Sequence, residues 1–351
     1  MIYKRFRIMS DNNQNRVGAF RPWHLVFVAV LAVATVFIIR NHNGLQQQTD
    51  VPFQKEEGYI FGTVYHLTYQ ADSSLHWSIL QELNRVDKSL SMFNPQSVIS
   101  RVNRNEDVVV DDLFKRVFEL SQRVSQATDG AFDITVAPLV NAWGFGFKND
   151  ELPTEAEVDS LRKLVGWQRI SIDADGRVIK EDPNMVLDCS AVAKGFGVDL
   201  AAECLRAHGV QNFMVEIGGE VIVAGINPNG EEWHVAVNKP TDDPTSTSNE
   251  FQTILPLTNT AMATSGNYRN FYTTEDGRRI AHTIDPATGY PVQHSLLSAT
   301  VFAPTCAEAD AFATSFMVKG LEGAKAVLQA NPQLRAYLIY DDGGEMKVFQ
   351  K

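Results

Sequence analysis

The sequence predicts an α+β fold, with mostly antiparallel sheets and packed helices, preceded by an N-terminal transmembrane helix. Helical patterns and short strand patterns come in separate runs, which favours α+β over a doubly wound parallel sheet. The segment Asp173–Gly176 joins two short strand patterns in the manner of a β-hairpin. The stretch Trp23–Ile39 is almost entirely apolar, which is typical of a membrane-spanning helix.

Composition and charge describe a globular body that does not suit nucleic acid. The chain has 351 residues, of which 44% are hydrophobic and 21% charged, enough for a large core. Residues 1–40 hold six of the 31 basic residues and one of the 42 acidic ones, which leaves a net charge of −16 on the rest. An acidic body excludes nucleic acid as the expected partner, and an anionic ligand would need a metal ion to offset the repulsion.

The N-terminus predicts a single-pass anchor. Its seventeen apolar residues, Trp23–Ile39, would span roughly 25 Å as a helix, close to the lower limit for crossing a bilayer. Basic residues precede the run, so residues 1–22 are predicted to lie in the cytoplasm and the body on the periplasmic side of the inner membrane. A cleaved signal peptide is the alternative. No cysteine follows the run, which excludes lipid attachment there.

The body is predicted to begin after a linker. Residues 40–57 are interpreted as this linker and residues 58–351 as one catalytic domain. Three cysteines lack metal-ligand spacing and a disulfide framework, so they are predicted to be small buried side chains (Cys189, Cys204 and Cys306).

Helices are predicted from apolar residues at three- and four-residue spacing and from capping boxes. Thr154-x-x-Glu157 and Thr305-x-x-Glu308 each open one. Glycines mark several helix ends, because glycine readily adopts the conformation that follows a last turn. The expected helices, in chain order, are Leu75–Leu90, Asp111–Ala127, 154–166, Ser190–Ala207 and 305–320, with a short helix after the last.

Strands are predicted where apolar residues alternate or where β-branched residues cluster between turn signals. A loop rich in Pro, Thr, Ser and Asp, Lys239–Glu250, separates two of them. The expected strands, in chain order, are Tyr59–Tyr69, Arg169–Ile172, Val178–Lys180, Phe213–Ile217, Glu220–Ala224, Trp233–Asn238, Phe251–Leu257, Arg278–Ile284, Leu297–Phe302, Ala336–Tyr340 and Met346–Phe349.

The stretch His282–Pro291 carries an imidazole and a carboxylate three residues apart, His282 and Asp285. Pro286 and Gly289 then force the backbone out of regular structure, so the loop would hold its side chains rigidly. Rigid loops are common places for functional sites. The alternative is a plain turn in which Asp285 caps its own backbone.

Two further segments suit a phosphate and a metal ion. A strand-to-helix junction runs from Asp188 to Gly197, and its free N–H groups and Lys194 could meet one anion. The alternative is a Ser190 N-cap with a surface lysine. Asp310 and Thr314 lie four apart on one helix face and could offer oxygens to Mg²⁺. Alternatively, Asp310 only complements the helix dipole.

Three other segments combine glycines with aromatic or polar residues. Thr128–Gly146 could wall a pocket for an aromatic ring system or be a packed loop. Gly218–Gly219 either allows a close backbone approach or forms a tight turn. Ser265–Arg269 joins two strands and offers a hydroxyl, an aromatic face and a guanidinium.

In their combination and order these motifs resemble the FAD:protein FMN transferase family (ApbE type) over residues 59–320. The resemblance rests on these segments: Phe61–Tyr65, Ser97–Asn103, Asp129–Asp133 through Trp143–Gly144, Asp188 with Lys194–Gly195, Gly218–Gly219, Ser265–Arg269, His282–Gly289 and Asp310 with Thr314.

The resemblance implies a role for each matching residue. Asp188 and Lys194 would hold FAD, and Ile284 and Gly130, Ala131 and Phe132 would line its site. The Ala191 carbonyl, Asp310 and Thr314 would ligate Mg²⁺. His282 would be the general base, with Asp285 either orienting it or turning the loop. Phe61 stands where the family usually has Met, and Phe93 occupies a position that is often aromatic. The family's lipoprotein cysteine is missing, and the apolar anchor would replace it.

The resemblance therefore implies Mg²⁺-dependent transfer of FMN from FAD to a Thr or Ser hydroxyl of an acceptor protein, with release of AMP. By the same analogy the acceptor would be a flavoprotein subunit of a membrane redox complex. Two alternatives stay open at this stage. One is an FAD pyrophosphatase that yields FMN and AMP. The other is a non-catalytic, membrane-tethered flavin-binding protein.

Overall fold

The computed structural model describes residues 35, 51–146, 152–240, 251–267, 271–273 and 279–351. The chain divides into two compact units, Met1–Pro52 and Phe53–Lys351, and all elements named below belong to the second. Among the described residues, no helix has the length and apolar character needed to cross a membrane. The predicted tail and anchor, residues 1–39, lie outside the described residues apart from Thr35 and stay a prediction.

An eight-stranded sheet forms the centre of the second unit. Every neighbouring pair in it is antiparallel, which confirms the predicted sheet type. The strands run in the order β1-β2-β5-β6-β9-β12-β13-β14. Their bounds are β1 Phe53–Ile60, β2 Thr63–Gln70, β5 Phe213–Ile217, β6 Glu220–Ala224, β9 Thr260–Gly266, β12 Leu296–Ala303, β13 Arg335–Asp342 and β14 Glu345–Gln350.

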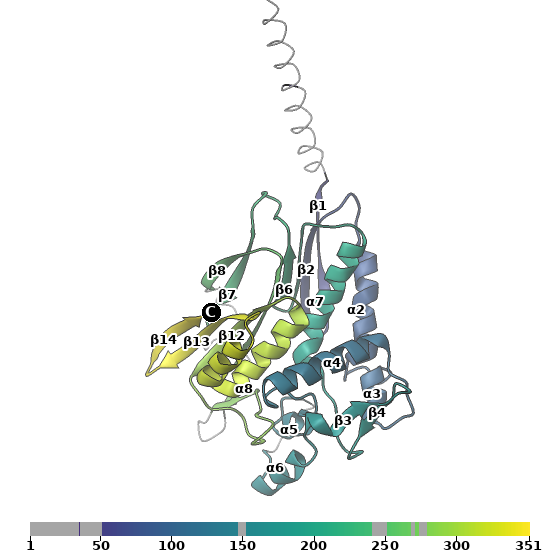
Figure 1. Ribbon diagram of the computed structural model, residues 1–351, viewed down its shortest axis with the longest axis vertical. Coiled ribbons are helices and arrows are strands. Elements are labelled where there is room, and N and C mark those ends of the chain that lie inside the picture. Colours follow the sequence, from purple (N-terminus) through teal and green to yellow (C-terminus); the bar gives the residue numbers. More distant parts are fainter. Residues whose placement is uncertain (1–34, 36–50, 147–151, 241–250, 268–270, 274–278) are drawn as a thin grey trace, which may run out of the picture. The chain divides into compact units, whose positions relative to one another are not determined.

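Helices cover one face of this sheet (Figure 1). The helix α7 (Ser190–Ala207) packs beside α8 (Cys306–Ala330), and α2 (His76–Leu90) packs against α7. Gly320 interrupts α8 with a φ of 67°, so its first segment ends where the sequence predicts and a second helical segment follows. Buried residues of β2, β5, α2 and α7 form one core cluster.

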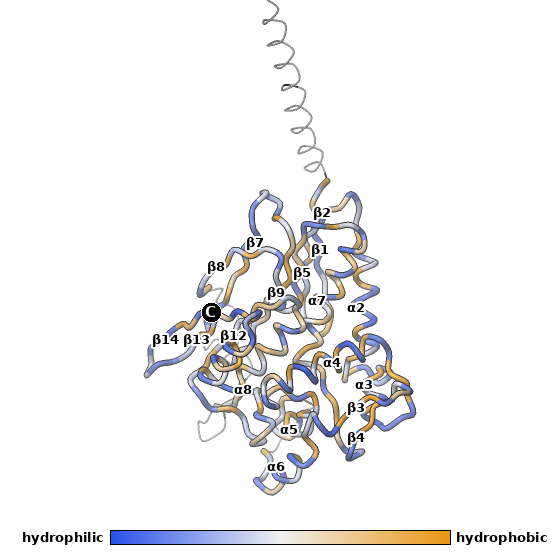
Figure 2. Tube along the Cα trace, in the orientation of Figure 1, coloured by the Kyte–Doolittle hydropathy of each residue, from blue (hydrophilic) through white to orange (hydrophobic). Residues whose placement is uncertain are grey.

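The opposite face of the sheet is covered by a hairpin of β7 (Trp233–Asn238) and β8 (Phe251–Leu257). Trp233 and Val235 of this hairpin are buried against Val221 and Met262 of the sheet. In Figure 2 hydrophilic segments occupy outer turns such as the one between β13 and β14, in keeping with an apolar interior.

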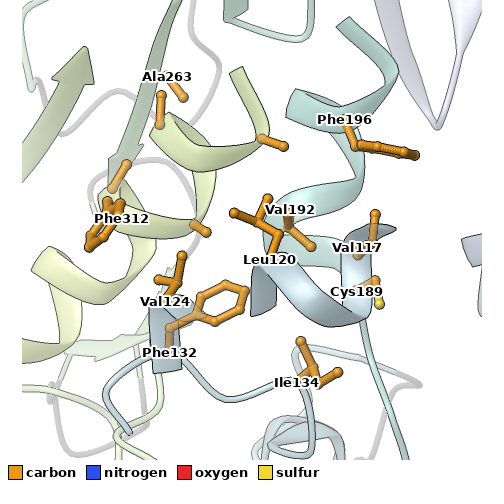
Figure 3. Packing of buried hydrophobic residues seen from close by; sticks show 14 of the residues in the cluster. Val117, Leu120, Val124, Phe132, Ile134, Cys189, Val192, Phe196, Ala263 and Phe312 are labelled. Carbon is orange, nitrogen blue, oxygen red and sulfur yellow. The ribbon is translucent and has the colours of Figure 1, made fainter. Parts of the chain in front are cut away.

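A third group of elements lies below α7 and α8 in the view of Figure 1. The amphipathic helix α4 (Asp112–Ala127) buries Val117, Leu120 and Val124 against residues of α7 and α8, as Figure 3 shows. The remaining elements are α3 Val98–Asn103, α5 Ala137–Ala142, α6 Glu155–Arg162, the 3₁₀ turn η1 Trp167–Arg169, and the short strands β3 Ile170–Ile172, β4 Val178–Lys180, β10 Phe271–Thr273 and β11 Arg279–Ala281.

The single strand predicted at Tyr59–Tyr69 is wrong. Phe61 and Gly62 have positive φ values of 51° and 75°, so the chain reverses there and forms the hairpin of β1 and β2. The linker prediction is wrong in its last five residues, because residues 53–57 belong to β1. The compact body therefore begins at Phe53 rather than at residue 58.

Other elements differ at their ends or were not predicted. The capping box at Thr154 and Glu157 is present, but α6 ends at Arg162, before the expected Gly166. The strand expected at Arg278–Ile284 covers only Arg279–Ala281 among the described residues. The central strand β9 and the short helices α3 and α5 were not predicted. The expected loop Lys239–Glu250 lies outside the described residues except for its first two positions. Cys189 and Cys306 are buried, Cys204 is half-buried, and all three are free.

Candidate active site

Three charged side chains from different elements meet on the helical side of the sheet. The Lys194 ammonium, on the second turn of α7, lies 2.6 Å from Oε1 of Glu220, the first residue of β6. Asp310 of α8 adds a second carboxylate whose charge also acts on Lys194. Glu220 and Asp310 are only 3% and 4% exposed, so these charges interact at low dielectric.

A close contact between α7 and α8 brings Asp310 to this place. The Asp310 Oδ2 accepts a hydrogen bond of 3.0 Å from the backbone N–H of Gly195. A Cβ atom added at Gly195 would lie 2.5 Å from the Cys306 carbonyl oxygen, so only glycine allows the helices to approach this closely. In a regular α-helix the N–H of Gly195 faces the carbonyl of Ala191. The Asp310 carboxylate therefore contacts the turn of α7 that begins at Ala191.

A buried carboxylate on α7 fixes the start of α8. Asp199 accepts hydrogen bonds from the N–H groups of Cys306 at 2.7 Å and Ala307 at 2.9 Å. Those N–H groups have no partner within the helix, and Asp199 satisfies them. The hydroxyl of Thr305 accepts a bond from Glu308 N in the same turn. The register of Asp310 against α7 is thus determined by side chains on both helices.

Burial and neighbouring charge shift the pKa values of this cluster. Burial alone would lower the pKa of Lys194, but the carboxylates of Asp310 and Glu220 outweigh it and hold that pKa above its usual range. Burial raises the pKa of Glu220 to about 7, with Lys194 opposing and Asp310 reinforcing the shift. Burial also raises the pKa of Asp310, against the opposing effects of Lys194 and the Gly195 N–H.

The hydroxyl predicted to accompany Asp310 lies on the same helix face. Thr314 Oγ1 is half-buried and 3.3 Å from the Ser265 hydroxyl on β9. Two residues after Ser265, the Asn267 Oδ1 atom accepts a hydrogen bond of 2.7 Å from the hydroxyl of Thr283. Thr283 is the neighbour of His282. This chain of contacts brings the loop that begins at His282 to the end of β9 where Thr314 lies.

The His282 loop is anchored by α5 and the residues after it. Ile284 is buried with Leu139 and Trp143 in a small core cluster. The Trp143 indole N–H donates a hydrogen bond of 2.8 Å to the Gly289 carbonyl. The rings of Phe145 and His282 pack edge to face, with 6.3 Å between their centroids. The loop is therefore held rigidly, as Pro286 and Gly289 predict. Because Ile284 is 4% exposed, its side chain packs in this cluster.

The carboxylate of Asp285 turns the loop. Its Oδ1 accepts a bond of 2.9 Å from Ala287 N, while the Asp285 carbonyl accepts from Gly289 N at 2.8 Å. The Asp285 N–H donates to the Tyr290 carbonyl at 2.9 Å. These contacts match the turn-forming alternative for Asp285.

The two segments expected to hold FAD meet through the backbone. The Asp188 N–H donates to the Ile134 carbonyl at 2.7 Å, so the start of α7 lies beside the loop that follows α4. The half-buried Asp188 Oδ1 accepts from the N–H and hydroxyl of Ser190, at 2.7 and 2.5 Å. The alternative interpretation of Ser190 as an N-cap is wrong, because Cys189 is the N-cap residue and Ser190 is the first helical residue.

The loop Gly130–Phe132 is held in a left-handed turn. Gly130 has a φ of 76°, and its N–H donates to the Ser125 carbonyl at 2.8 Å. The Phe132 side chain is buried among core residues of α4, α7 and α8 (Figure 3), so it belongs to the hydrophobic core. Ala131 is also buried. Asp133 fixes this loop by accepting bonds from Thr135 and from Trp167 N at 2.8 and 2.9 Å.

The two aromatic candidates differ in their surroundings. A Cβ at Gly197 would lie 2.6 Å from the Phe61 ring, so Phe61 packs on α7 one turn beyond Lys194. Phe93 is 76% exposed and follows α2. The glycine pair Gly218–Gly219 has φ values of 62° and 101° and forms the tight turn between β5 and β6. Tyr268 and Arg269 of the predicted Ser265–Arg269 segment lie outside the described residues.

Two buried acids of the site were not predicted as functional. Glu220 was identified only as a strand start and Asp199 only as part of a helix. The available signal for Glu220 is a charged residue that directly follows two glycines and opens an otherwise apolar strand, Glu220–Ala224. Asp199 lies among apolar and small residues of α7, which is a weaker signal of the same kind.

The residues present suit a magnesium ion that shares its coordination with a ligand. Within the described part of the chain, no three His, Cys, Asp or Glu side chains gather closely enough to hold a metal. The predicted ligands, the buried Asp310 carboxylate, the Thr314 hydroxyl and the Ala191 carbonyl, would make an oxygen-only set with one charge. Mg²⁺ uses few protein ligands and completes its shell with phosphate oxygens and water, so this set fits.

A separate cavity of about 290 Å³ lies at the other end of α7, lined by residues such as Arg206, Phe213 and Asn259. It does not include Lys194, Asp310 or His282. The charged cluster, rather than this cavity, therefore marks the candidate active site.

Comparison with known proteins finds one matching family model and several similar sequences and structures. The ApbE family model matches residues 61–338. The FAD:protein FMN transferase of Haemophilus influenzae is 39% identical over 298 residues, covering 80% of this chain and 85% of that protein. The FAD:protein FMN transferase of Escherichia coli K12 is 32% identical over 336 residues, covering 92% and 94%. The structure of flavin transferase ApbE from Vibrio cholerae superposes with a TM-score of 0.76 at 35% identity, covering 86% of this chain and 98% of that one.

Proposed function

The chain belongs to the ApbE family, and from this membership we propose that it is an FAD:protein FMN transferase. The proposed reaction is Mg²⁺-dependent. It moves FMN from FAD to a Thr or Ser hydroxyl of an acceptor protein, forms a phosphoester-linked flavin and releases AMP. One observation of the site carries the proposal: Lys194 and Asp310, 116 positions apart in the sequence, meet through the Gly195–Asp310 hydrogen bond.

The proposed site places each matching residue around the diphosphate of FAD. Lys194 supplies positive charge, and the backbone of Gly130–Phe132 and the side chain of Asp188 hold the rest of the dinucleotide. Asp310, Thr314 and the Ala191 carbonyl would hold Mg²⁺, which when bound acts as a Lewis acid on the phosphoryl oxygens. The acidic body otherwise repels an anionic substrate, so the cations of the site are what make binding favourable.

In the proposed transfer, the acceptor hydroxyl oxygen forms a bond to the phosphorus of the FMN half. The diphosphate P–O bond breaks, and its electron pair leaves with AMP. His282 takes the hydroxyl proton, a contribution of roughly 10²–10⁴-fold in rate for general base catalysis. Its rigid loop, held by Trp143 and Thr283, supports this role by fixing the direction of the imidazole.

Incubation of the chain with FAD, Mg²⁺ and candidate acceptor proteins, followed by intact mass measurement, tests the proposal. The expected result is one added FMN per acceptor together with an equivalent amount of AMP. AMP and FMN release without any acceptor gain would instead assign an FAD pyrophosphatase. FAD binding without AMP release would assign a non-catalytic binding protein.

The location and the partner are part of the proposal. We place the anchor Trp23–Ile39 in the inner membrane and the catalytic body on the periplasmic side, supported by the basic residues before the apolar run. The proposed acceptor is a flavoprotein subunit of a membrane redox complex. Protease accessibility in spheroplasts tests the topology, because the body should be cleaved from outside while residues 1–22 stay protected.

A further inference from the structure

Glu220 occupies a position that the proposed function does not explain. Its Oε1 pairs with Lys194 at 2.6 Å, whereas its Oε2 is buried and has no hydrogen-bond partner among the described residues. A buried carboxylate with one oxygen unsatisfied costs free energy. The fold must therefore keep this charge in place through the rest of the cluster.

The turn before Glu220 determines where its side chain points. Gly218 and Gly219 form a two-residue connection in which Ile217 pairs with Glu220. A Cβ at Gly218 would lie 2.7 Å from the Thr63 side chain, so glycine is needed for this tight reversal. Within β6, Ile222 and Ala224 face α7 in the core, and the two-residue period of a strand puts Glu220 on that same side.

Two carboxylates compete for one ammonium in this cluster. Lys194 is attracted by both Glu220 and Asp310, but its short ion pair is with Glu220. Asp310 uses Oδ2 to accept from Gly195 N, a neutral donor. If Glu220 lost its charge, the Asp310 carboxylate would be the one member of this cluster left to pair with Lys194. A direct Lys194–Asp310 pair would put a cation where the metal is expected.

We propose that Glu220 is a positioning residue that retains the Lys194 ammonium, so that the Asp310 carboxylate stays accessible to a divalent cation. This inference rests on the metal site of the proposed function and adds a residue to it. It also accounts for the net charge of the cluster. When both carboxylates are ionised, the two carboxylates and one ammonium sum to −1, which favours a divalent cation. Removal of the Glu220 charge leaves a neutral pair, which does not.

A Glu220→Gln change would weaken cation binding in two separate ways. Loss of a nearby negative charge weakens cation binding whether or not Lys194 is present. Release of Lys194 toward Asp310 weakens it only when Lys194 is present. A double-mutant cycle between Glu220→Gln and Lys194→Met measures this coupling. Glu220→Asp keeps the charge on a shorter side chain and serves as the conservative variant.

The full chain is titrated with Mn²⁺ as the probe, without acceptor protein and at an FAD concentration that saturates each variant, because Lys194→Met is expected to weaken FAD binding. Free Mn²⁺ is counted by electron paramagnetic resonance. Circular dichroism first shows that each variant is folded. The expected result is a rise of at least tenfold in the Mn²⁺ dissociation constant for Glu220→Gln. The same change in the Lys194→Met background should raise it less than threefold. Glu220→Asp should recover most of the affinity. If Glu220→Gln does not fold, Glu220→Met, which also removes the charge, replaces it in the cycle.

Each outcome decides the matter. An unchanged dissociation constant in Glu220→Gln overturns the inference, and so does a penalty of equal size in both backgrounds, which would show a plain charge effect. If the wild-type chain binds Mn²⁺ and Asp310→Asn does not, the metal site stands whatever Glu220 does. A wild-type chain that binds no Mn²⁺ removes the metal site, and the inference with it.

Discussion

The Asp310 carboxylate on α8 accepts a hydrogen bond of 3.0 Å from the backbone N–H of Gly195 on α7. This single contact joins the segment that carries Lys194 to the segment that carries Thr314. It forms where the two helices approach closely, since a Cβ added at Gly195 would lie 2.5–2.9 Å from backbone atoms of Cys306 and Ala307. The geometry of the candidate site therefore depends on helix packing as much as on the side chains themselves.

Replacing Gly195 by alanine should disrupt this contact. The added Cβ would meet the Cys306 carbonyl at 2.5 Å and the Ala307 Cα at 2.9 Å, and backbone atoms cannot move aside cheaply. We expect a loss of about 1–3 kcal/mol in the free energy of unfolding and a marked loss of FMN transfer. Thermal unfolding and the transfer assay measure both quantities.

Gly197→Ala is the matched control for that change. It lies on the same helix, and its Cβ would meet the Phe61 ring at 2.6 Å, which is a side chain that can rotate. The loss of stability and of transfer should be clearly smaller than for Gly195→Ala. Equal effects of the two changes would show that the α7–α8 contact has no special importance.

Asp310→Asn separates charge from hydrogen bonding. The asparagine Oδ1 can still accept from Gly195 N, so the helices should stay packed and the melting temperature should change little. The missing charge should abolish the Mg²⁺ dependence and lower transfer by at least a hundredfold. Transfer rates across a Mg²⁺ titration test this, and a normal titration curve for the variant would contradict the ligand role of Asp310.

Much of the fold could be predicted because its signals are local. Two examples are the capping box at Thr154 and Glu157 and the apolar stripe of α4, because each lies within one short stretch of sequence. The strand β9 was missed because Thr260–Gly266 consists mostly of small residues, without the alternation typical of a half-buried strand. It is a central strand, between β6 and β12, and its small side chains allow α8 to pack closely against it.

The missing parts of the site depend on contacts that no short window of sequence contains. Lys194 and Asp310 were proposed from local patterns, a strand-to-helix junction and a pair four residues apart with Thr314, and the resemblance to a family implied their roles. Glu220 and Asp199 become meaningful only when β6 and α8 pack against α7, which brings residues 26 and 107 positions apart together. The β1–β2 reversal was missed because Phe61 adopts a positive φ, which is uncommon for an aromatic residue.

His282→Ala should separate binding from transfer. The imidazole is predicted to take the acceptor proton and not to hold FAD, so FAD affinity should change less than threefold while transfer falls by roughly 10²–10⁴-fold. Fluorescence titration with FAD and intact mass of the acceptor measure the two effects. Undiminished FMN attachment by the variant would remove His282 from the role of general base.

Asp285 offers a test of what its carboxylate does. In the structure Asp285 Oδ1 accepts from Ala287 N, a bond that an asparagine can also form. We therefore expect Asp285→Asn to keep transfer within threefold of wild type and Asp285→Ala to lower it by loosening the loop. Transfer rates of both variants, with their melting temperatures, decide this. An inactive but stable Asp285→Asn would instead show that the carboxylate charge acts on His282.

The pH dependence of stability should report on Asp199. Burial raises its pKa from an ordinary 3.8 to about 7, although the N–H groups of Ala307 and Cys306 oppose the shift. Between these values the folded chain binds more protons at this site than the unfolded chain, so the free energy of unfolding falls as pH rises. The stability that the protonated carboxyl contributes is complete below about pH 4 and is lost as pH rises through 7.

Asp199→Asn removes this titration and keeps one acceptor for the α8 N-terminus. The difference in melting temperature between wild type and variant should therefore favour wild type more at pH 5 than at pH 8, by an amount equivalent to a few kcal/mol at most. Asp111→Asn is the control, because Asp111 also accepts a backbone N–H at a helix start, from Phe114 N at 2.8 Å, but lies outside the α7–α8 contact. Differences for Asp199→Asn that are constant across this pH range would show that Asp199 stays ionised in the folded chain. In that case the hydrogen bonds from the Cys306 and Ala307 N–H groups would outweigh the free-energy cost of burying the Asp199 charge.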